Sequence, residues 1–261
     1  REEGETIGPL VGRPVIADGT VYVSSSDGRV YALDVRFGDE VWVSDKLSEK
    51  LWAAPVISGS HLYVTTFDGR IHGLEAETGK LLRWTFEAES GFVSSPALHQ
   101  DVLLAGSAGR RLYAVRLGEE EAIWELEGGD WFWATPLVSQ GRVYASCLDG
   151  KLYALDAETG EPLWSEPFDA GERLATSPVL VEGSLVIATE PGDVFIVDAQ
   201  TGRGKLVTGG KEDRDYTVGG KVLASLGASG DNAYVLTQED RLYAVDVRQE
   251  TISWELSLEL E

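Results

Sequence analysis

The feature that most constrains this chain is a phrase that recurs along its whole length. Residues 153–164 read YALDAETGEPLW, and Trp164 follows eight residues after Asp156. Five related phrases begin at Val30, Ile71, Leu112, Val194 and Leu242. A fixed period of this kind is the signature of repeat folds, so it takes precedence over local structure. The sequence therefore predicts six copies of one structural unit.

A proline marks the start of each unit except the last. These prolines are Pro14, Pro55, Pro96, Pro136 and Pro178, and Leu226 stands at this position in the sixth unit. The resulting units cover residues 9–50, 51–91, 92–131, 132–173, 174–221 and 222–261. Closed β architectures of about this length form single domains. We expect residues 1–261 to be one domain.

Each unit alternates apolar and polar residues in the manner of half-buried β-strands. Asp-Gly pairs at Asp27, Asp68 and Asp149 interrupt this alternation, and Asp-Gly is a strong signal for a tight hairpin. Proline is tolerated at the first residue of a strand, where its missing amide is not needed. Four strands per unit follow. The sequence predicts an all-β fold, a six-bladed β-propeller with four antiparallel strands per blade; an open solenoid is the weaker alternative.

The acidic residue and the tryptophan of the phrase have separate structural roles. The carboxylate of Asp156 can accept hydrogen bonds from the turn that follows it, and Gly160 supplies a conformation that other residues resist. The tryptophan brings a large ring whose N–H needs a partner, which suits a position between two blades. We predict equivalent positions for Trp42, Trp84, Trp124, Trp164 and Trp254, with Leu206 at the same position in the remaining unit.

The pattern Ala154, Asp156, Thr159, Gly160 and Trp164 resembles the tryptophan-docking motif of the PQQ-like (quinoprotein/BamB-like) β-propeller repeat family. The resemblance covers essentially the entire chain. It implies a propeller, and it implies little about function, because the family contains quinoprotein dehydrogenases, the BamB-like lipoprotein of outer-membrane assembly, and sensor or scaffold domains.

An enzymatic interpretation finds little support in the residues. Quinone-dependent members of the family generally have eight blades, a calcium ion held by Glu, Asn and Asp, and often adjacent cysteines. This chain has six units, one cysteine at Cys147 and one asparagine at Asn232. Its histidines, His61, His72 and His99, lack the close spacing of a zinc site. We predict no catalytic residues, no metal and no cofactor. The alternative is a small-ligand or PQQ/calcium-dependent oxidoreductase site in the central channel.

Aromatic residues gather in the segments just before the inner strands. Because exposed aromatic side chains are typical anchors of protein interfaces, we predict a partner-binding surface there. Its residues are Trp52, Phe92, Trp131, Trp133, Asp130 and Glu49. The alternative is that these rings cap the packing of the channel. The long segment 207–221 is a second region of interest, since long loops in compact domains are functional or disordered.

Charge narrows the choice of partner. The chain has 22 Lys and Arg against 44 Asp and Glu, a formal net charge of −22. Nucleic acid and anionic lipid recruit basic surfaces, so we expect neither as a partner, and no apolar run is long enough to span a membrane. We predict a monomeric, non-enzymatic scaffold or sensor that binds a protein or peptide, with membership of a larger chain left open. The family resemblance implies a location outside the cytoplasm, in the periplasm or at the cell surface. The absence of methionine leaves open an anchor in a removed N-terminal segment.

Overall fold

The computed structural model describes residues 9–10, 12–48, 50–207 and 217–258. The chain divides into two compact units, residues 1–127 and residues 128–261, and each is described by itself. All regular structure within the described residues is β-strand. Accordingly, that part of the chain contains no helix that could cross a membrane.

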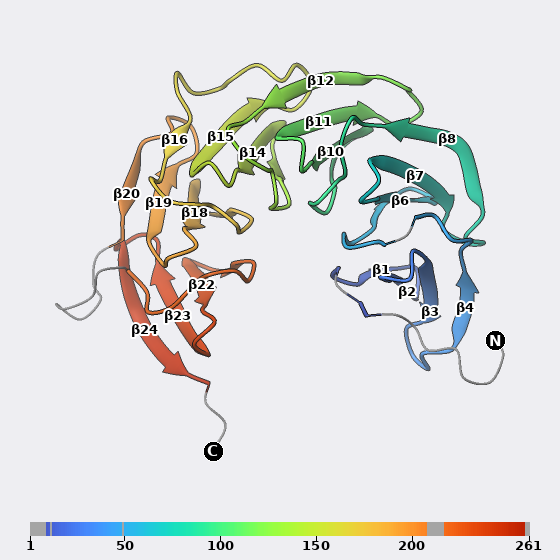
Figure 1. The fold of residues 1–261 in the computed structure, drawn as a ribbon. Helices are drawn as coiled ribbons and strands as arrows, with labels where there is room; N and C mark the ends of the chain where they lie inside the picture. The colour runs from blue at the N-terminus through green and yellow to red at the C-terminus, as the bar shows by residue number, and fades with distance from the viewer. Residues whose placement is uncertain (1–8, 11, 49, 208–216, 259–261) are drawn as a thin grey trace. The chain divides into compact units, whose positions relative to one another are not determined.

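The first unit contains three four-stranded antiparallel sheets, numbered in chain order (Figure 1). Sheet 1 holds β1 (Val15–Ala17), β2 (Thr20–Ser24), β3 (Val30–Asp34) and β4 (Glu40–Val43); sheet 2 holds β5 (Val56–Ser58), β6 (His61–Thr65), β7 (Arg70–Glu75) and β8 (Leu81–Glu87); sheet 3 holds β9 (Ala97–His99), β10 (Val102–Gly106), β11 (Arg111–Arg116) and β12 (Ala122–Glu127).

The second unit repeats this arrangement in three further sheets. Sheet 4 holds β13 (Leu137–Ser139), β14 (Arg142–Ser146), β15 (Lys151–Asp156) and β16 (Phe168–Asp169); sheet 5 holds β17 (Val179–Val181), β18 (Ser184–Ala188), β19 (Val194–Asp198) and β20 (Gly204–Leu206); sheet 6 holds β21 (Gly227–Ser229), β22 (Asn232–Leu236), β23 (Arg241–Asp246) and β24 (Thr251–Ser257).

Within every sheet the strands lie side by side in chain order, as successive hairpins require. In sheet 1, for example, Val21 pairs with Leu33 and Ser24 pairs with Val30 across the Asp-Gly turn. The predicted strand content, with six sheets of four antiparallel strands, is confirmed. The prediction of one single domain stays a prediction.

The turn between the second and third strands fixes the tyrosine that begins the repeated phrase. In sheet 4 the carboxylate of Asp149 accepts hydrogen bonds from the Lys151 amide at 3.0 Å and the Tyr153 hydroxyl at 2.8 Å. In sheet 3 the corresponding turn residue is Gly109, which has no carboxylate. The buried hydroxyl of Tyr113 consequently has no hydrogen-bond partner among the described residues.

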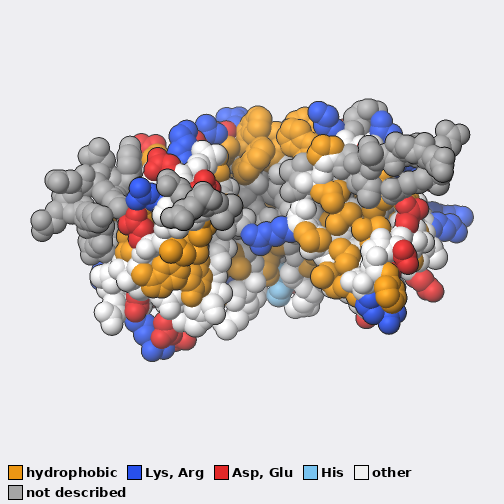
Figure 2. All heavy atoms as spheres, turned by 90° about the horizontal axis from the view of Figure 1, so that it is seen from below, with side chains coloured by type: hydrophobic (Ala, Val, Ile, Leu, Met, Phe, Trp, Pro, Cys, Tyr) orange, Lys and Arg blue, Asp and Glu red, His pale blue; other side chains and the backbone are white. Residues whose placement is uncertain are grey.

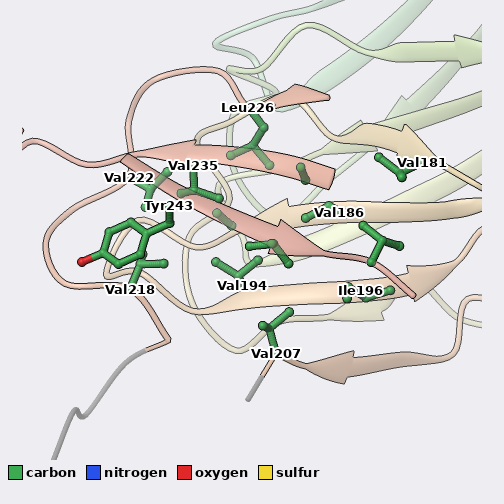
Figure 3. Packing of buried hydrophobic residues seen from close by; sticks show 14 residues of the cluster. Val181, Val186, Val194, Ile196, Val207, Val218, Val222, Leu226, Val235 and Tyr243 are labelled. Atoms are coloured by element: carbon green, nitrogen blue, oxygen red, sulfur yellow. The ribbon is translucent and has the colours of Figure 1, made fainter. Parts of the chain in front are cut away.

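The hydrophobic core lies between successive sheets of a unit. Figure 3 shows this for sheets 5 and 6, where Val186, Val194 and Ile196 of sheet 5 pack in one cluster with Val235 and Tyr243 of sheet 6. Because β-branched residues fit a pleated surface, valines dominate this layer. Each sheet therefore buries its apolar side chains against its neighbour, and the fold is stabilised by repeated sheet-to-sheet contacts.

Tryptophan strengthens these contacts in the way the repeat predicts. Trp42 of sheet 1 donates from Nε1 to the Ala76 carbonyl of sheet 2 at 2.9 Å, and the Tyr22 hydroxyl donates to the same oxygen at 3.1 Å. Trp164 and Tyr144 of sheet 4 both donate to the Ala199 carbonyl of sheet 5, at 3.3 Å and 3.1 Å. The repeated phrase thus supplies both the ring and the turn that receives it. We call this receiving segment, from the acidic residue to the glycine, the docking turn.

The prediction for Leu206 is wrong. Ala32, Ala114 and Ala244 pair with tryptophans 42, 124 and 254, and a β-bulge follows each alanine. Sheet 5 has no such bulge, so Lys205 pairs with the equivalent residue, Ile196, and Leu206 is shifted to Phe195. The ammonium of Lys205 bonds the Glu250 carboxylate of sheet 6 at 3.0 Å. An ion pair therefore replaces the tryptophan at this junction.

Trp254 has the predicted place in its sheet but not the predicted burial. Its ring is 45% exposed, whereas Trp42 and Trp164 are 9% and 6% exposed. The ring packs beside Tyr234 at 6.0 Å and has no hydrogen-bond partner among the described residues. The left part of Figure 2, where β21–β24 lie, shows hydrophobic side chains at the surface, in keeping with the exposure of Leu256 at 51%. The difference arises because no sheet follows sheet 6 within the second unit, so that unit supplies no docking turn for this ring.

Candidate functional site

The segment Asp130–Trp133 of the second unit presents two large rings at its surface. Trp131 and Trp133 are 39% and 40% exposed, while Phe132 between them is 1% exposed and packs on Tyr153 at 5.6 Å. Alternation with a period of two places neighbouring side chains on opposite sides of an extended segment. Burial of Phe132 thus turns both tryptophans outward.

Several hydrogen bonds hold this segment against the turn that follows β14. The Leu148 amide donates to the Trp131 carbonyl at 2.9 Å, and the Cys147 thiol donates to the Asp130 carbonyl at 3.1 Å. The Trp131 amide donates to the Asp130 carboxylate at 2.8 Å. Because its backbone is fixed, the segment loses little entropy when a partner binds, which favours recognition.

The two ionisable side chains beneath the segment, Asp149 and Cys147, have pKa values shifted in opposite directions. Burial opposes ionisation of Asp149, but hydrogen bonds from the Gly129 amide, the Tyr153 hydroxyl and the Lys151 amide outweigh it and lower the pKa of Asp149. Burial raises the pKa of Cys147 to about 12. Cys147 is therefore a buried, neutral thiol at physiological pH, whereas the thiolate is the nucleophilic form.

We expect Asp149 to make stability depend on pH. Its pKa is lower in the folded state than in the unfolded chain, so its contribution is present at neutral pH. That contribution declines below about pH 4 and disappears once the pH falls beneath the lowered pKa. Asp149→Asn should be less stable than wild type at pH 7 and nearer to it at pH 3, in urea unfolding at both values. Glu172→Gln, which removes an exposed carboxylate of the same unit without a partner among the described residues, should show no such convergence.

Trp52 belongs to the first unit. Its half-buried ring stacks on Phe67 at 5.0 Å, and the Lys50 ammonium lies 5.8 Å from the ring. Phe67 is 44% exposed and stands in the turn between β6 and β7. A phenylalanine in a hairpin turn is itself an unusual signal, and the sequence prediction passed over it. The Trp52 ring is thus only half-buried rather than fully exposed, because the Phe67 ring covers part of it.

Two other predicted site residues have different outcomes. Phe92 is 2% exposed and packs against Phe86 and Tyr113 at 6.4 Å and 5.7 Å. Its place in the partner-binding set is a wrong prediction, because Phe92, like its counterparts Leu51 and Phe132 four residues before a proline, is buried in the core. Glu49 lies outside the described residues, as do residues 208–216 of the segment 207–221.

A pocket of about 340 Å³ opens between sheets 2 and 3 of the first unit. We call it the glutamate pocket, because its lining includes Glu87, Glu89, Glu120, Glu121 and Glu125. The rings of Phe86 and Tyr113 form its apolar part. In the sequence, three of the glutamates near this pocket form the run 119–121, and adjacent carboxylates on a turn are usually a solvated edge. The repeat does not show that β8 and the loop 119–121 line the same pocket.

No group of three or more His, Cys, Asp or Glu side chains among the described residues is placed to hold a metal ion. The candidate sites are consequently an aromatic surface in the second unit, a stacked pair in the first, and the glutamate pocket. The aromatic surface and the stacked pair could bind a polypeptide through their rings, and the glutamate pocket could do so through its negative charge.

Four-stranded sheets that pack on one another through a tryptophan and a docking turn define the class of tryptophan-docked β-propellers, and the predicted fold class is confirmed. A family model described as outer membrane protein assembly factor BamB matches residues 3–82, 26–128 and 82–260. The chain belongs to this family. Its overlapping matches reflect the internal repeat.

The chain is similar to several proteins named outer membrane protein assembly factor BamB. It is 28% identical over 234 residues to that of Legionella pneumophila (strain Paris), covering 90% of this chain and 50% of the relative. It is 28% identical over 199 residues to that of Moranella endobia, covering 70% of this chain and 50% of the relative. The crystal structure of BamB from Moraxella catarrhalis superposes with a TM-score of 0.76 at 20% identity, over 97% of this chain and 78% of that one. The chain spans about half the length of the curated relatives it matches first.

Proposed function

We propose that this chain is a non-enzymatic binding scaffold that captures a protein or peptide partner outside the cytoplasm. Membership of the BamB family supports this proposal, since its relatives carry the name of assembly factors. A scaffold of this kind requires a rigid surface with large rings at its centre. Propellers meet that requirement because repeated packing holds their connecting segments in place.

The observation that carries the proposal is the exposed pair Trp131 and Trp133. Tryptophan is enriched at interface hot spots, where a buried ring contributes much of the binding energy. In this segment two such rings flank the buried Phe132 on a backbone that is already hydrogen-bonded. The Asp130 carboxylate accepts from the Trp131 amide, and the Asp149 carboxylate accepts from the amide of Gly129 in the same loop. An apolar peptide with basic flanks therefore has the complementary chemistry, and the net charge of −22 assists its approach.

The double substitution Trp131→Ala/Trp133→Ala tests the proposal. We expect it to weaken binding of a basic-flanked apolar peptide by at least about tenfold, because interface tryptophans contribute about 2 kcal/mol or more. The melting temperature should change by only a few degrees, since exposed rings contribute little to folding. Calorimetric titration gives the affinity, and a thermal melt gives the stability.

Trp254→Ala is the matched control, because it removes a ring of similar exposure from the same unit. It should leave peptide affinity unchanged. Two results would contradict the proposal: equal losses of affinity in the control and the double variant, or a large fall in melting temperature in the double variant with unchanged affinity per folded molecule. The second result would mean that the rings cap the internal packing.

A further inference from the structure

Two departures from the repeat meet at the glutamate pocket. At the docking turn of sheet 3, Arg116 replaces the acidic residue, and Glu119 and Glu120, followed by Glu121, stand where the motif has its Thr-Gly pair. At the hairpin turn of the same sheet, Gly109 replaces the aspartate that binds the tyrosine hydroxyl elsewhere. Residues freed from a structural role in the repeat are the places where a fold can acquire a binding site.

The change at the hairpin turn leaves a buried polar group on the pocket wall. Tyr113 is 2% exposed and lines the pocket, and its hydroxyl has no hydrogen-bond partner among the described residues. Buried polar groups are normally hydrogen-bonded, so an unsatisfied one calls for a ligand or another explanation. Burial, together with the nearby Glu125 carboxylate, raises the pKa of Tyr113 and outweighs the opposite effect of the neighbouring Arg111 guanidinium and Glu89 backbone, so the hydroxyl stays protonated.

The change at the docking turn places free carboxylates at the pocket and fixes the loop that carries them. Trp84 of sheet 2 donates from Nε1 to the Glu119 carbonyl at 2.7 Å, where other tryptophans bind the residue after the acidic position. The next two residues, Glu120 and Glu121, line the pocket and have no ion pair with a described residue. The docking tryptophan therefore positions both carboxylates.

The protein itself shows which chemistry these carboxylates accept. The guanidinium of Arg111 bridges two of the lining glutamates, with Nη1 at 3.0 Å from Glu89 and 3.2 Å from Glu125. Arg70 pairs with Glu87 at 3.5 Å. These two arginines balance part of the charge of the five glutamates, and the remainder is negative. The rings of Phe86 and Tyr113 offer apolar surface for the methylene stem of a long side chain.

We propose that the glutamate pocket binds a lysine or arginine side chain of a partner polypeptide. Glu120 and Glu121 pair with the cationic group, the Tyr113 hydroxyl is its neutral hydrogen-bond partner, and the rings pack on its stem. The pocket and the surface at Trp131 and Trp133 share no residue. It rests on the proposed function only in that the ligand is part of a polypeptide.

The indole N–H of Trp84 is a direct reporter, because it is bonded to the residue before Glu120. We expect a short arginine peptide, Ac-Gly-Gly-Arg-Gly-Gly-amide, to shift its signal in 1H–15N spectra saturably. The same peptide with citrulline, which has the shape but not the charge, should not. Glu120→Gln/Glu121→Gln should weaken binding at least about tenfold, and Tyr113→Phe about threefold or more.

Asp39→Asn/Glu77→Gln is the matched control, because it makes the same change in net charge at exposed turns of sheets 1 and 2. It should bind the arginine peptide as wild type does. An equal loss in the control would mean that the general negative field attracts the peptide, and this would overturn the proposal. No shift at millimolar peptide would also overturn it, and so would unchanged affinity in the two pocket variants.

Two further measurements distinguish a site for small cations from a polypeptide site, and the pocket from the tryptophan surface. Guanidinium ion binding as tightly as the peptide would identify the site as one for small cations and overturn the polypeptide assignment. The Trp131→Ala/Trp133→Ala variant should retain arginine binding, so failure at the tryptophan surface and failure at the pocket are distinguishable.

Discussion

Trp164→Ala is expected to lower the free energy of unfolding by about 3–5 kcal/mol, the range for a buried large ring replaced by alanine. The ring is 6% exposed and lies between sheets 4 and 5, against the docking turn at Gly202. The substitution leaves a cavity there and removes the Nε1 donor to the Ala199 carbonyl. Urea unfolding followed by circular dichroism measures the loss.

Trp254→Ala makes the same chemical change in the same unit at the other extreme of burial. Its ring is 45% exposed and donates to no described residue, so we expect a cost below about 1 kcal/mol. The difference between the two variants measures what enclosure by a following sheet contributes. Similar costs at both positions would show that the tryptophan stabilises only its own sheet and that docking on the next sheet adds nothing.

Gly79→Ala is expected to cost about 2–5 kcal/mol for two separate reasons. The residue has a φ of +70°, a conformation that costs an L-residue with a side chain roughly 1–2 kcal/mol. An added Cβ would also meet the Trp42 ring at 2.4 Å. Because overpacking costs about 1–3 kcal/mol, the ring must move and the hydrogen bond from Trp42 to Ala76 is weakened. Denaturant unfolding gives the cost, and Trp42 fluorescence is expected to report the displaced ring.

Gly38→Ala separates the cost of backbone strain from the cost of contact with a tryptophan ring. Gly38 has a φ of +74° and its amide donates to the Asp34 carbonyl, as the Gly79 amide donates to Glu75. A Cβ at Gly38 would meet no atom within 4 Å. We expect this variant to cost only the backbone strain, about 1–2 kcal/mol. Equal costs for Gly38→Ala and Gly79→Ala would mean that contact with the tryptophan ring adds nothing to the docking turn.

Sequence reasoning identified the aromatic surface in part. Trp131 and Trp133 were found because they lie in a segment just before an inner strand, and both are exposed. Phe92 was included wrongly, because a position just before an inner strand does not distinguish an exposed ring from a buried one, and the Phe92 ring is buried. Phe67 was missed, since its partner Trp52 is fifteen residues away and only the hairpin brings them together.

The glutamate pocket could not be predicted from the repeat. Its carboxylates come from β8, the segment after it, the loop 119–121 and β12, and the repeat relates these positions only as equivalents in different units. A signal available in the sequence was the loss of aspartate at Gly109, which predicts a tyrosine hydroxyl without its usual partner. Recognising that loss requires knowing that the aspartate and tyrosine are bonded, which is a fact of the folded hairpin.

The sequence by itself determined the strands, their order in each sheet and the number of sheets. These features depend on neighbours along the chain, because hairpin turns and period-two alternation are local. Tertiary structure decided which tryptophans are enclosed, why Lys205 replaces one of them, and where Glu120 meets Tyr113. Those outcomes depend on the adjacent sheet: a ring is buried only if a docking turn lies over it, and a bulge of one residue decides which side chain reaches that turn.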